Sequence, residues 1–274
     1  MGRVIRLSLM YAALPRGARV RFSLGATGDP SRVARLAADL GYDGLELAAA
    51  DPRSPEARAA VRAFEREGLE VAAVSTGLMY VLYGLSLSSP SREERLRALQ
   101  MFEGYIDLAA EAGSRVVVVG LARGRCEGGC SQSMQRLRES LESLGPKCDE
   151  TSVKLALEPI NRYETDLVNR LGEAYEIASS MSHVGLLFDS FHAMLEERDP
   201  YEAILEYSSR IVHVHLADSN RRAPGMGIVD WERLIYRLFR GGYRGFATVE
   251  AIVEPSLEDM ARTAASTLRP LIPG

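Results

Sequence analysis

Three observations predict an α/β fold, a (β/α)8 TIM barrel. Eight short apolar runs alternate with eight helical patterns along 274 residues, and no linker interrupts them. Runs such as VVVVG (116–120) and VGLLF (184–188) are continuously apolar, as in parallel strands covered on both faces. Ligand-type side chains follow four successive runs at spacings of 31, 26 and 35 residues, close to the roughly 31 residues per unit of a ~250-residue barrel. We therefore expect residues 1–274 to form one barrel domain.

The eight apolar runs are the expected strands. A second apolar segment, ARVRFSLG (18–25), competes with the first run, and we prefer the earlier one, with 11–28 as a loop over the barrel mouth. The expected strands are 4–10, 44–47, 70–75, 115–119, 153–157, 184–188, 211–216 and 246–250.

The intervening segments carry helix start and stop signals. Pro30 follows Asp29 and precedes a helical pattern that Gly41 closes, and Ser91 with Glu94 forms a capping-box pattern. The expected helices are 30–41, 54–68, 91–113, 131–144, 171–181, 200–208, 230–240 and 256–268. The first strand is not followed by the GxGxxG turn of a dinucleotide-binding open sheet, so a closed barrel is favoured.

Composition narrows the function classes. A net charge of −4 argues against a general nucleic-acid binder. The N-terminus resembles neither a signal peptide nor a membrane span, so we expect a cytoplasmic protein with no membrane partner. Cys126 and Cys130 in RCEGGC are interpreted as reduced loop thiols, with a local disulfide as the alternative, because two thiols do not complete a zinc site.

Four side chains at the ends of successive runs form the candidate metal site. They are Glu158 after LAL, Asp189 after LLF, His215 as the second histidine of HVHL, and Glu250 after ATV. The carboxyl ends of barrel strands meet at one face, where catalytic groups gather. Three carboxylates and one imidazole suit Mn²⁺, Mg²⁺ or Co²⁺, and Zn²⁺ also fits. Unpaired carboxylates in a partly dry mouth need a cation or a proton.

Neighbouring residues extend this site. Glu164, His192 and Arg221 follow the ligand-bearing strands in predicted loops and could reach the same pocket. His213 lies two residues before His215 on the same side of its strand, and we interpret it as a packed core residue. His183 precedes a strand at the opposite rim and is interpreted as structural.

Several segments together resemble a known family. LEPINRYETD, FDSFHAMLEE, HVHLADSNRRAPGMG followed by DW, and ATVEA are similar to signature segments of the xylose-isomerase-like barrel superfamily. Within it the chain is most similar to the ketose 3-epimerases, the tagatose and psicose epimerase group. YDGLEL, STGL and EAGSRVVVVG extend the resemblance over the first half. Hydroxypyruvate isomerases and dehydratases share the second-half segments.

The resemblance implies one divalent metal ion, Mn²⁺ first among the candidates, and assigns roles. The family's four metal ligands match Glu158, Asp189, His215 and Glu250, and its two acid/base carboxylates match Glu158 and Glu250. Residues that hold the substrate match Glu164, His192 and Arg221, and Glu46 matches a frequent glutamate of less defined role. Met226 departs from the pattern, because many members have an acidic residue in this PGxG turn.

The expected function is a metal-dependent sugar epimerase or isomerase. It would move a proton next to a ketone through a metal-bound enediolate, in a ketose 3-epimerisation. Hydroxypyruvate-type isomerisation and dehydration are the alternatives on the same residues.

A DNA-repair endonuclease on this fold would need further histidines in the first half, and all four histidines lie at or after position 183. A non-catalytic sugar-binding barrel is the other rival. The resemblance leaves a homo-oligomer open, because members often associate.

Overall fold

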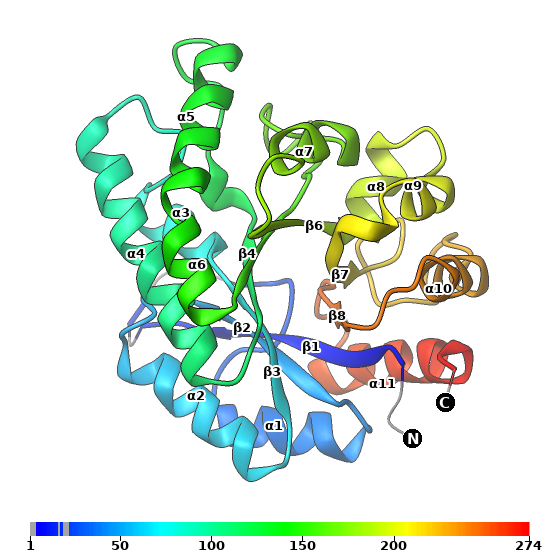
Figure 1. The fold of residues 1–274 in the computed structure, drawn as a ribbon. Coiled ribbons are helices and arrows are strands. Elements are labelled where there is room, and N and C mark those ends of the chain that lie inside the picture. Colours follow the sequence, from blue (N-terminus) through cyan, green and yellow to red (C-terminus); the bar gives the residue numbers. More distant parts are fainter. Residues whose placement is uncertain (1–3, 16, 19–21, 274) are drawn as a thin grey trace.

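A closed barrel of eight parallel strands forms the centre of the protein (Figure 1). The computed structural model describes residues 4–15, 17–18 and 22–273. Each strand pairs with the next, and the first pairs with the last. The strands are β1 (Arg6–Ala13), β2 (Gly44–Ala49), β3 (Glu70–Ser75), β4 (Val116–Val119), β5 (Lys154–Leu157), β6 (Val184–Asp189), β7 (Ile211–Leu216) and β8 (Phe246–Val249). The predicted TIM barrel is confirmed, and each apolar run overlaps one of these strands.

The preference for the earlier first strand is also confirmed. β1 pairs with β2 and with β8 and so closes the barrel. The competing segment 18–25 lies partly outside the described residues, and its described residues form no strand.

Each of the eight expected helices is present. They are α1 (Pro30–Asp39), α2 (Pro55–Arg66), α4 (Arg92–Glu111), α5 (Cys130–Ser143), α7 (Leu171–Ala178), α9 (Pro200–Glu206), α10 (Trp231–Arg240) and α11 (Leu257–Leu268). Only half of the predicted capping box forms: Ser91 Oγ accepts from the Glu94 amide, while the Glu94 carboxylate binds the Ser89 hydroxyl instead. None of the described helices has the length and apolar character needed to span a bilayer.

Three short helices were not expected from the sequence. They are α3 (Gly77–Tyr83), α6 (Gly145–Thr151) and α8 (Ser190–Glu196). Helix α8 begins directly after β6, because the Asp189 carboxylate accepts a hydrogen bond of 2.8 Å from the His192 amide. His192, which was predicted to lie in a loop, therefore sits in the first turn of α8.

Strand alternation decides which side chains enter the barrel. On β5, Leu155 and Leu157 belong to the main core, while Ala156 packs in a separate small cluster with Leu187 of β6. Side chains two residues apart on a strand share a face, so Glu158 lies on the inward side with Ala156. The same alternation directs Glu46, Asp189, His213, His215 and Glu250 inward. The inward side chains at the carboxyl-terminal ends of β5 to β8 are thus polar, and a second polar layer with Glu46 and His213 lies deeper, level with apolar residues such as Leu187.

The two cysteines after β4 are bonded to each other. Cys126 and Cys130 form a disulfide, so the interpretation as reduced thiols is wrong and the alternative of a local disulfide holds. Cys130 is also the first residue of α5, so the bond ties the start of this helix to the loop before it. The spacing of four residues allowed both readings, because it does not report the oxidation state.

Arg123, just after β4, is a fully buried cation. Its guanidinium donates to the carbonyl oxygens of Gly120, Glu158, Leu167 and Val168 at 2.5 to 3.2 Å. Burial lowers the pKa of Arg123 to about 10, against the attraction of Glu158. The side chain therefore joins the loops after β4 and β5 and fixes the backbone on which Glu158 is carried.

We predict that Arg123→Met lowers the free energy of unfolding by at least about 3 kcal/mol, because four buried carbonyl groups lose a charged donor. Urea denaturation of the metal-free protein measures this change. The control is Arg125→Met, which removes one exposed bond to the Glu164 carbonyl and should lower it by less than about 1 kcal/mol. Equal effects of the two substitutions would contradict the bridging role.

Candidate metal centre

The four predicted ligands converge around His215 Nδ1. This atom lies 3.3 Å from Glu158 Oε1, 3.8 Å from Asp189 Oδ2 and 3.2 Å from Glu250 Oε2. One ligand atom from each of the four residues lies within 4.8 Å of every other. Glu158, Asp189 and His215 are at most 5% exposed. The register predicted from strand ends is therefore a compact cluster in three dimensions.

His215 Nδ1 shows that the cluster fits a cation. The atom is buried and has no hydrogen-bond partner among the described residues. The other ring nitrogen, Nε2, lies 3.1 Å from both oxygens of Glu46 and carries the proton of this hydrogen bond. Nδ1 of the neutral ring is then a lone pair that faces three carboxylates. The carboxylate oxygens and the Nδ1 lone pair repel one another unless a cation lies between them. Oxygen ligands with one imidazole suit a divalent ion.

The pKa values show how a proton substitutes for a cation here. Burial, with the nearby Glu158, raises the pKa of Asp189 to about 7. Burial opposes the charged form of His215, but Glu46 and Glu250 outweigh it and hold the pKa of His215 well above its usual value. Burial is the main cause for Asp189, whereas the neighbouring carboxylates are the cause for His215.

A cavity of about 200 Å³ opens beside the cluster at the barrel mouth. Glu158, His215 and Glu250 line it, together with the three residues predicted to hold a substrate: Glu164, His192 and Arg221. The opposite wall is mostly apolar and comes from the first four strands and their loops. Its residues include Met10, Phe22, Leu24, Ala48, Leu78, Val81 and Leu121.

His192 is a neutral hydrogen-bond donor at this cavity. Its Nδ1 lies 2.7 Å from the Asn161 side-chain nitrogen, which is a donor, so Nδ1 accepts and Nε2 carries the proton. Burial, reinforced by Arg221, holds the pKa of His192 well below its usual value. The imidazole therefore stays uncharged while it offers an N–H group.

Arg221 supplies the positive charge at the cavity. Its Nη1 lies 2.5 Å from Glu164 Oε1, and its guanidinium stacks 4.9 Å from the Phe191 ring centre. Burial works against the cation, but Glu250 and Glu164 outweigh it and raise the pKa of Arg221. The backbone of Arg221 is left-handed, with φ of 61°, which is an uncommon conformation for a residue with a side chain and is held here by bonds from its N–H to Asp218 and from Ile252 to its carbonyl.

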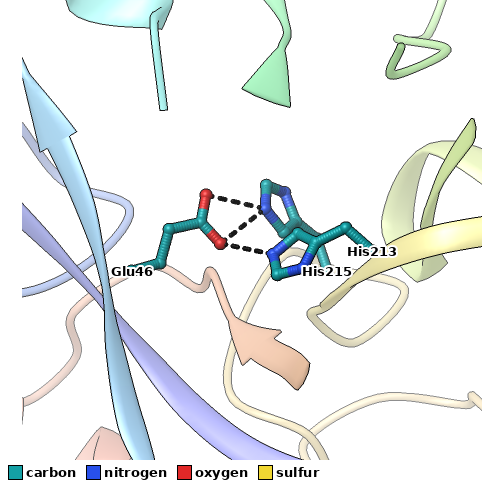
Figure 2. Close-up of side chains that lie close together, drawn as sticks. All are labelled: Glu46, His213 and His215. Carbon is teal, nitrogen blue, oxygen red and sulfur yellow. Dashed lines mark hydrogen bonds and ion pairs between the residues drawn. The ribbon is translucent and has the colours of Figure 1, made fainter. Parts of the chain in front are cut away.

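Glu46, His213 and His215 form a second buried group (Figure 2), and His215 is shared with the four predicted ligands. Glu46 is 0% exposed, and its Oε2 lies 2.7 Å from His213 Nε2. Burial favours the neutral acid, but His215 and His213 outweigh it and hold the pKa of Glu46 well below its usual range. His213 is buried as predicted, yet it belongs to a polar network. His183 lies apart, with Nε2 3.0 Å from the Leu141 carbonyl.

Sequence reasoning overlooked several residues that shape the site. Asn161 bonds both His192 and Glu164, and it was visible within the LEPINRYETD segment. Gly120 leaves room for a ligand, because a Cβ there would lie 2.6 Å from Glu158 Oε2. The signal available for the Arg123 contacts was its charge, four residues after the end of the apolar strand β4.

Comparison with known proteins places this geometry in a family. Residues 34–271 match the sequence profile described as Xylose isomerase-like TIM barrel. The chain is 26% identical to the 3-dehydro-D-guloside 4-epimerase of Escherichia coli (strain K12) over 250 residues, 85% of this chain and 90% of that protein. It is 26% identical to the ketose 3-epimerase of Arthrobacter globiformis over 231 residues, 81% of this chain and 78% of that protein.

A solved structure of an L-ribulose 3-epimerase shares the fold, with a TM-score of 0.81, 21% identity and coverage of 97% of this chain and 95% of that chain. The protein therefore belongs to the xylose isomerase-like TIM barrel family, as its sequence segments predicted. Its named relatives are sugar epimerases, so the predicted isomerase class is confirmed.

We predict that protons compete with the metal at this cluster. In the metal-free protein, Asp189 takes up a proton as the pH falls through about 7, and a metal ion must displace that proton. The dissociation constant for Mn²⁺ should therefore be at least about tenfold larger at pH 6 than at pH 8, because His215, whose pKa is also raised, must lose a proton as well. Calorimetric titration at both pH values measures it. Equal affinities would show that the carboxylates are already ionised without a metal.

Proposed function

We propose that this chain, as one barrel domain, is a divalent-metal-dependent epimerase that inverts a carbon next to the ketone of a sugar. The proposal has Mn²⁺ as the first candidate metal, with Glu158, Asp189, His215 and Glu250 as its ligands. A bound divalent ion would polarise the ketone and an adjacent hydroxyl as a Lewis acid. The buried, partnerless Nδ1 of His215 among three carboxylates supports this assignment.

The positions of Glu158 and Glu250 carry the proposal for the reaction. Both carboxylates line the cavity, one after β5 and the other after β8, with β6 and β7 between them. They therefore approach a bound substrate from different sides of the mouth. One carboxylate removes the proton from the carbon next to the ketone, and the other returns a proton to the opposite face. Inversion at that carbon is the result.

The other polar residues at the cavity suit the enediolate intermediate. His192 offers a neutral N–H group, and Arg221 offers a cation beside Glu250. Both can stabilise negative charge that develops on a substrate oxygen. Glu164 and Asn161 hold Arg221 and His192 in place at 2.5 and 2.7 Å, so little reorganisation is needed during the reaction.

Ketose 3-epimerisation is the finer assignment that we propose, in line with the ketose 3-epimerase relative. A second candidate is 4-epimerisation of a 3-keto sugar, because the E. coli 4-epimerase aligns with 85% of this chain. In both reactions the inverted carbon adjoins the ketone, so the same residues serve. Return of the proton to the neighbouring carbon would give a hydroxypyruvate-type isomerisation, and loss of a β-hydroxyl would give dehydration.

We predict that Glu158→Gln and Glu250→Gln each lower turnover by at least ~10³-fold, because each removes a proton-transfer group. The measurement is product formation from a panel of ketoses and 3-keto sugars in deuterated water with Mn²⁺, with deuterium located by NMR. Deuterium should enter at the inverted carbon next to the ketone.

The matched control is Glu254→Gln, which alters an exposed glutamate four residues beyond Glu250 that pairs with Arg222. It should keep wild-type turnover. Near wild-type activity of either site variant, or product without deuterium from solvent, would overturn the two-carboxylate mechanism.

Removal of metal should abolish turnover and destabilise the fold, because only the native state assembles the four ligands. Restoring Mn²⁺ at one hundred times its dissociation constant should stabilise the protein by about 2.7 kcal/mol. Thermal unfolding after chelation and after metal addition measures this. Unchanged activity in the chelated protein would rule out the metal dependence.

A further inference from the structure

The two ring nitrogens of His215 face different groups. Nδ1 faces the three carboxylates of the proposed metal centre at 3.2 to 3.8 Å. Nε2 faces Glu46, 3.1 Å from each carboxylate oxygen. Figure 2 shows the Glu46 carboxylate pointing at the imidazoles of both His215 and His213. A neutral imidazole has one proton and one lone pair, so the group at Nε2 decides what Nδ1 can do.

Glu46 is itself fixed in place. His213 Nε2 lies 2.7 Å from its Oε2, and the Ser75 hydroxyl donates to its Oε1. His213 Nε2 also lies 3.2 Å from the Thr248 hydroxyl, which is 2.8 Å from the Ser8 hydroxyl. These contacts come from five different strands of the barrel. The carboxylate therefore cannot turn away from His215 without breaking bonds in a fully buried network.

We propose that Glu46 is a positioning residue for the metal centre, which keeps the proton of His215 on Nε2 and aims its Nδ1 lone pair at Glu158, Asp189 and Glu250. The inference rests on the metal site of the proposed function. A carboxylate that accepts from the second nitrogen of a ligand histidine fixes the ring orientation and makes the ring a stronger donor. His213 and Ser75 act one step further out, because they hold Glu46.

Glu46, His213 and His215 also lie close enough to hold a metal themselves. That arrangement needs the lone pair of His215 on Nε2, so it excludes the first one. It would provide only three protein ligands, each at most 1% exposed. Glu158, His215 and Glu250 line the cavity, whereas Glu46 and His213 are not among its lining residues. The geometry favours the metal on the Nδ1 side, where a substrate can reach it.

The test is the affinity of Glu46→Gln for Mn²⁺. A glutamine keeps the size of the side chain, but it has no charge and only one acceptor oxygen, because its NH₂ group cannot accept a hydrogen bond from an imidazole N–H. We expect Mn²⁺ binding, measured by calorimetry, to be 10- to 100-fold weaker than in the wild type. We also expect the absorption spectrum of the Co²⁺-loaded protein to change, since His215 is no longer fixed. Wild-type affinity with a wild-type spectrum would overturn the proposal.

The matched control is Glu196→Gln, which neutralises another buried glutamate whose partner, Arg162, lies 2.7 Å away. It should leave Mn²⁺ affinity within twofold of the wild type, even where it lowers thermal stability. Equal weakening in both variants would show a general loss of packing and would also overturn the positioning role.

A second variant covers the case in which Glu46→Gln does not fold. Glu46→Asp keeps the charge but withdraws it by one methylene, so one carboxylate can no longer reach both imidazoles. We expect at least fivefold weaker Mn²⁺ binding, and wild-type affinity would overturn the proposal.

Asp189→Asn distinguishes a failure of the proposed metal centre from a failure of the positioning role of Glu46. If the wild type binds no divalent ion, or Asp189→Asn binds it normally, the proposed metal centre is wrong; if only the Glu46 variants bind normally, the positioning role alone is wrong.

Discussion

His215 lies between two sets of buried carboxylates, and this arrangement constrains the rest of the site. Glu46 faces one ring nitrogen, while Glu158, Asp189 and Glu250 face the other. Four carboxylates around one imidazole would repel one another strongly in a dry interior if all of them were ionised. A divalent cation would remove most of this repulsion, whereas protons would neutralise it only in part. Metal content, protonation and stability are therefore linked through one cluster of side chains.

The barrel brings these charged side chains together because neighbouring strands each point one side chain inward at a similar height. On β5, β6, β7 and β8 the inward positions beside the mouth carry ligand-type residues, while deeper positions such as Ala156 and Leu187 are apolar. Helices cover the outer face, and backbone groups are paired in the barrel ladder. Local contacts then complete the site, as when Asp189 caps α8 and so places His192 at the cavity.

Features that depend on local pattern could be predicted from the sequence, whereas pairings across the barrel could not. The apolar runs gave all eight strands, and the strand-end positions of Glu158 and Asp189 indicated the metal cluster. Glu46 and His215 are 169 residues apart on strands that are not neighbours, so their contact requires the closed barrel. The buried Arg123 clamp likewise joins two loops that are adjacent only after folding, and α8 is too short to show a helical period.

The cavity has a charged half and an apolar half. Its charged lining side chains among the described residues, Glu158, Glu164, Arg221 and Glu250, all come from β5 onward in the chain. The wall from the first four strands is mostly apolar, with Leu78 and Leu121 among its residues. In the proposed reaction the charged half acts only on the ketone and the adjoining carbon, so it would serve any ketone placed against it. Under this proposal, the position of that ketone along the sugar would depend on how the remainder of the substrate packs against the apolar wall. Under the proposed mechanism, 3-epimerisation and 4-epimerisation would use the same four residues and would differ in how that wall holds the sugar.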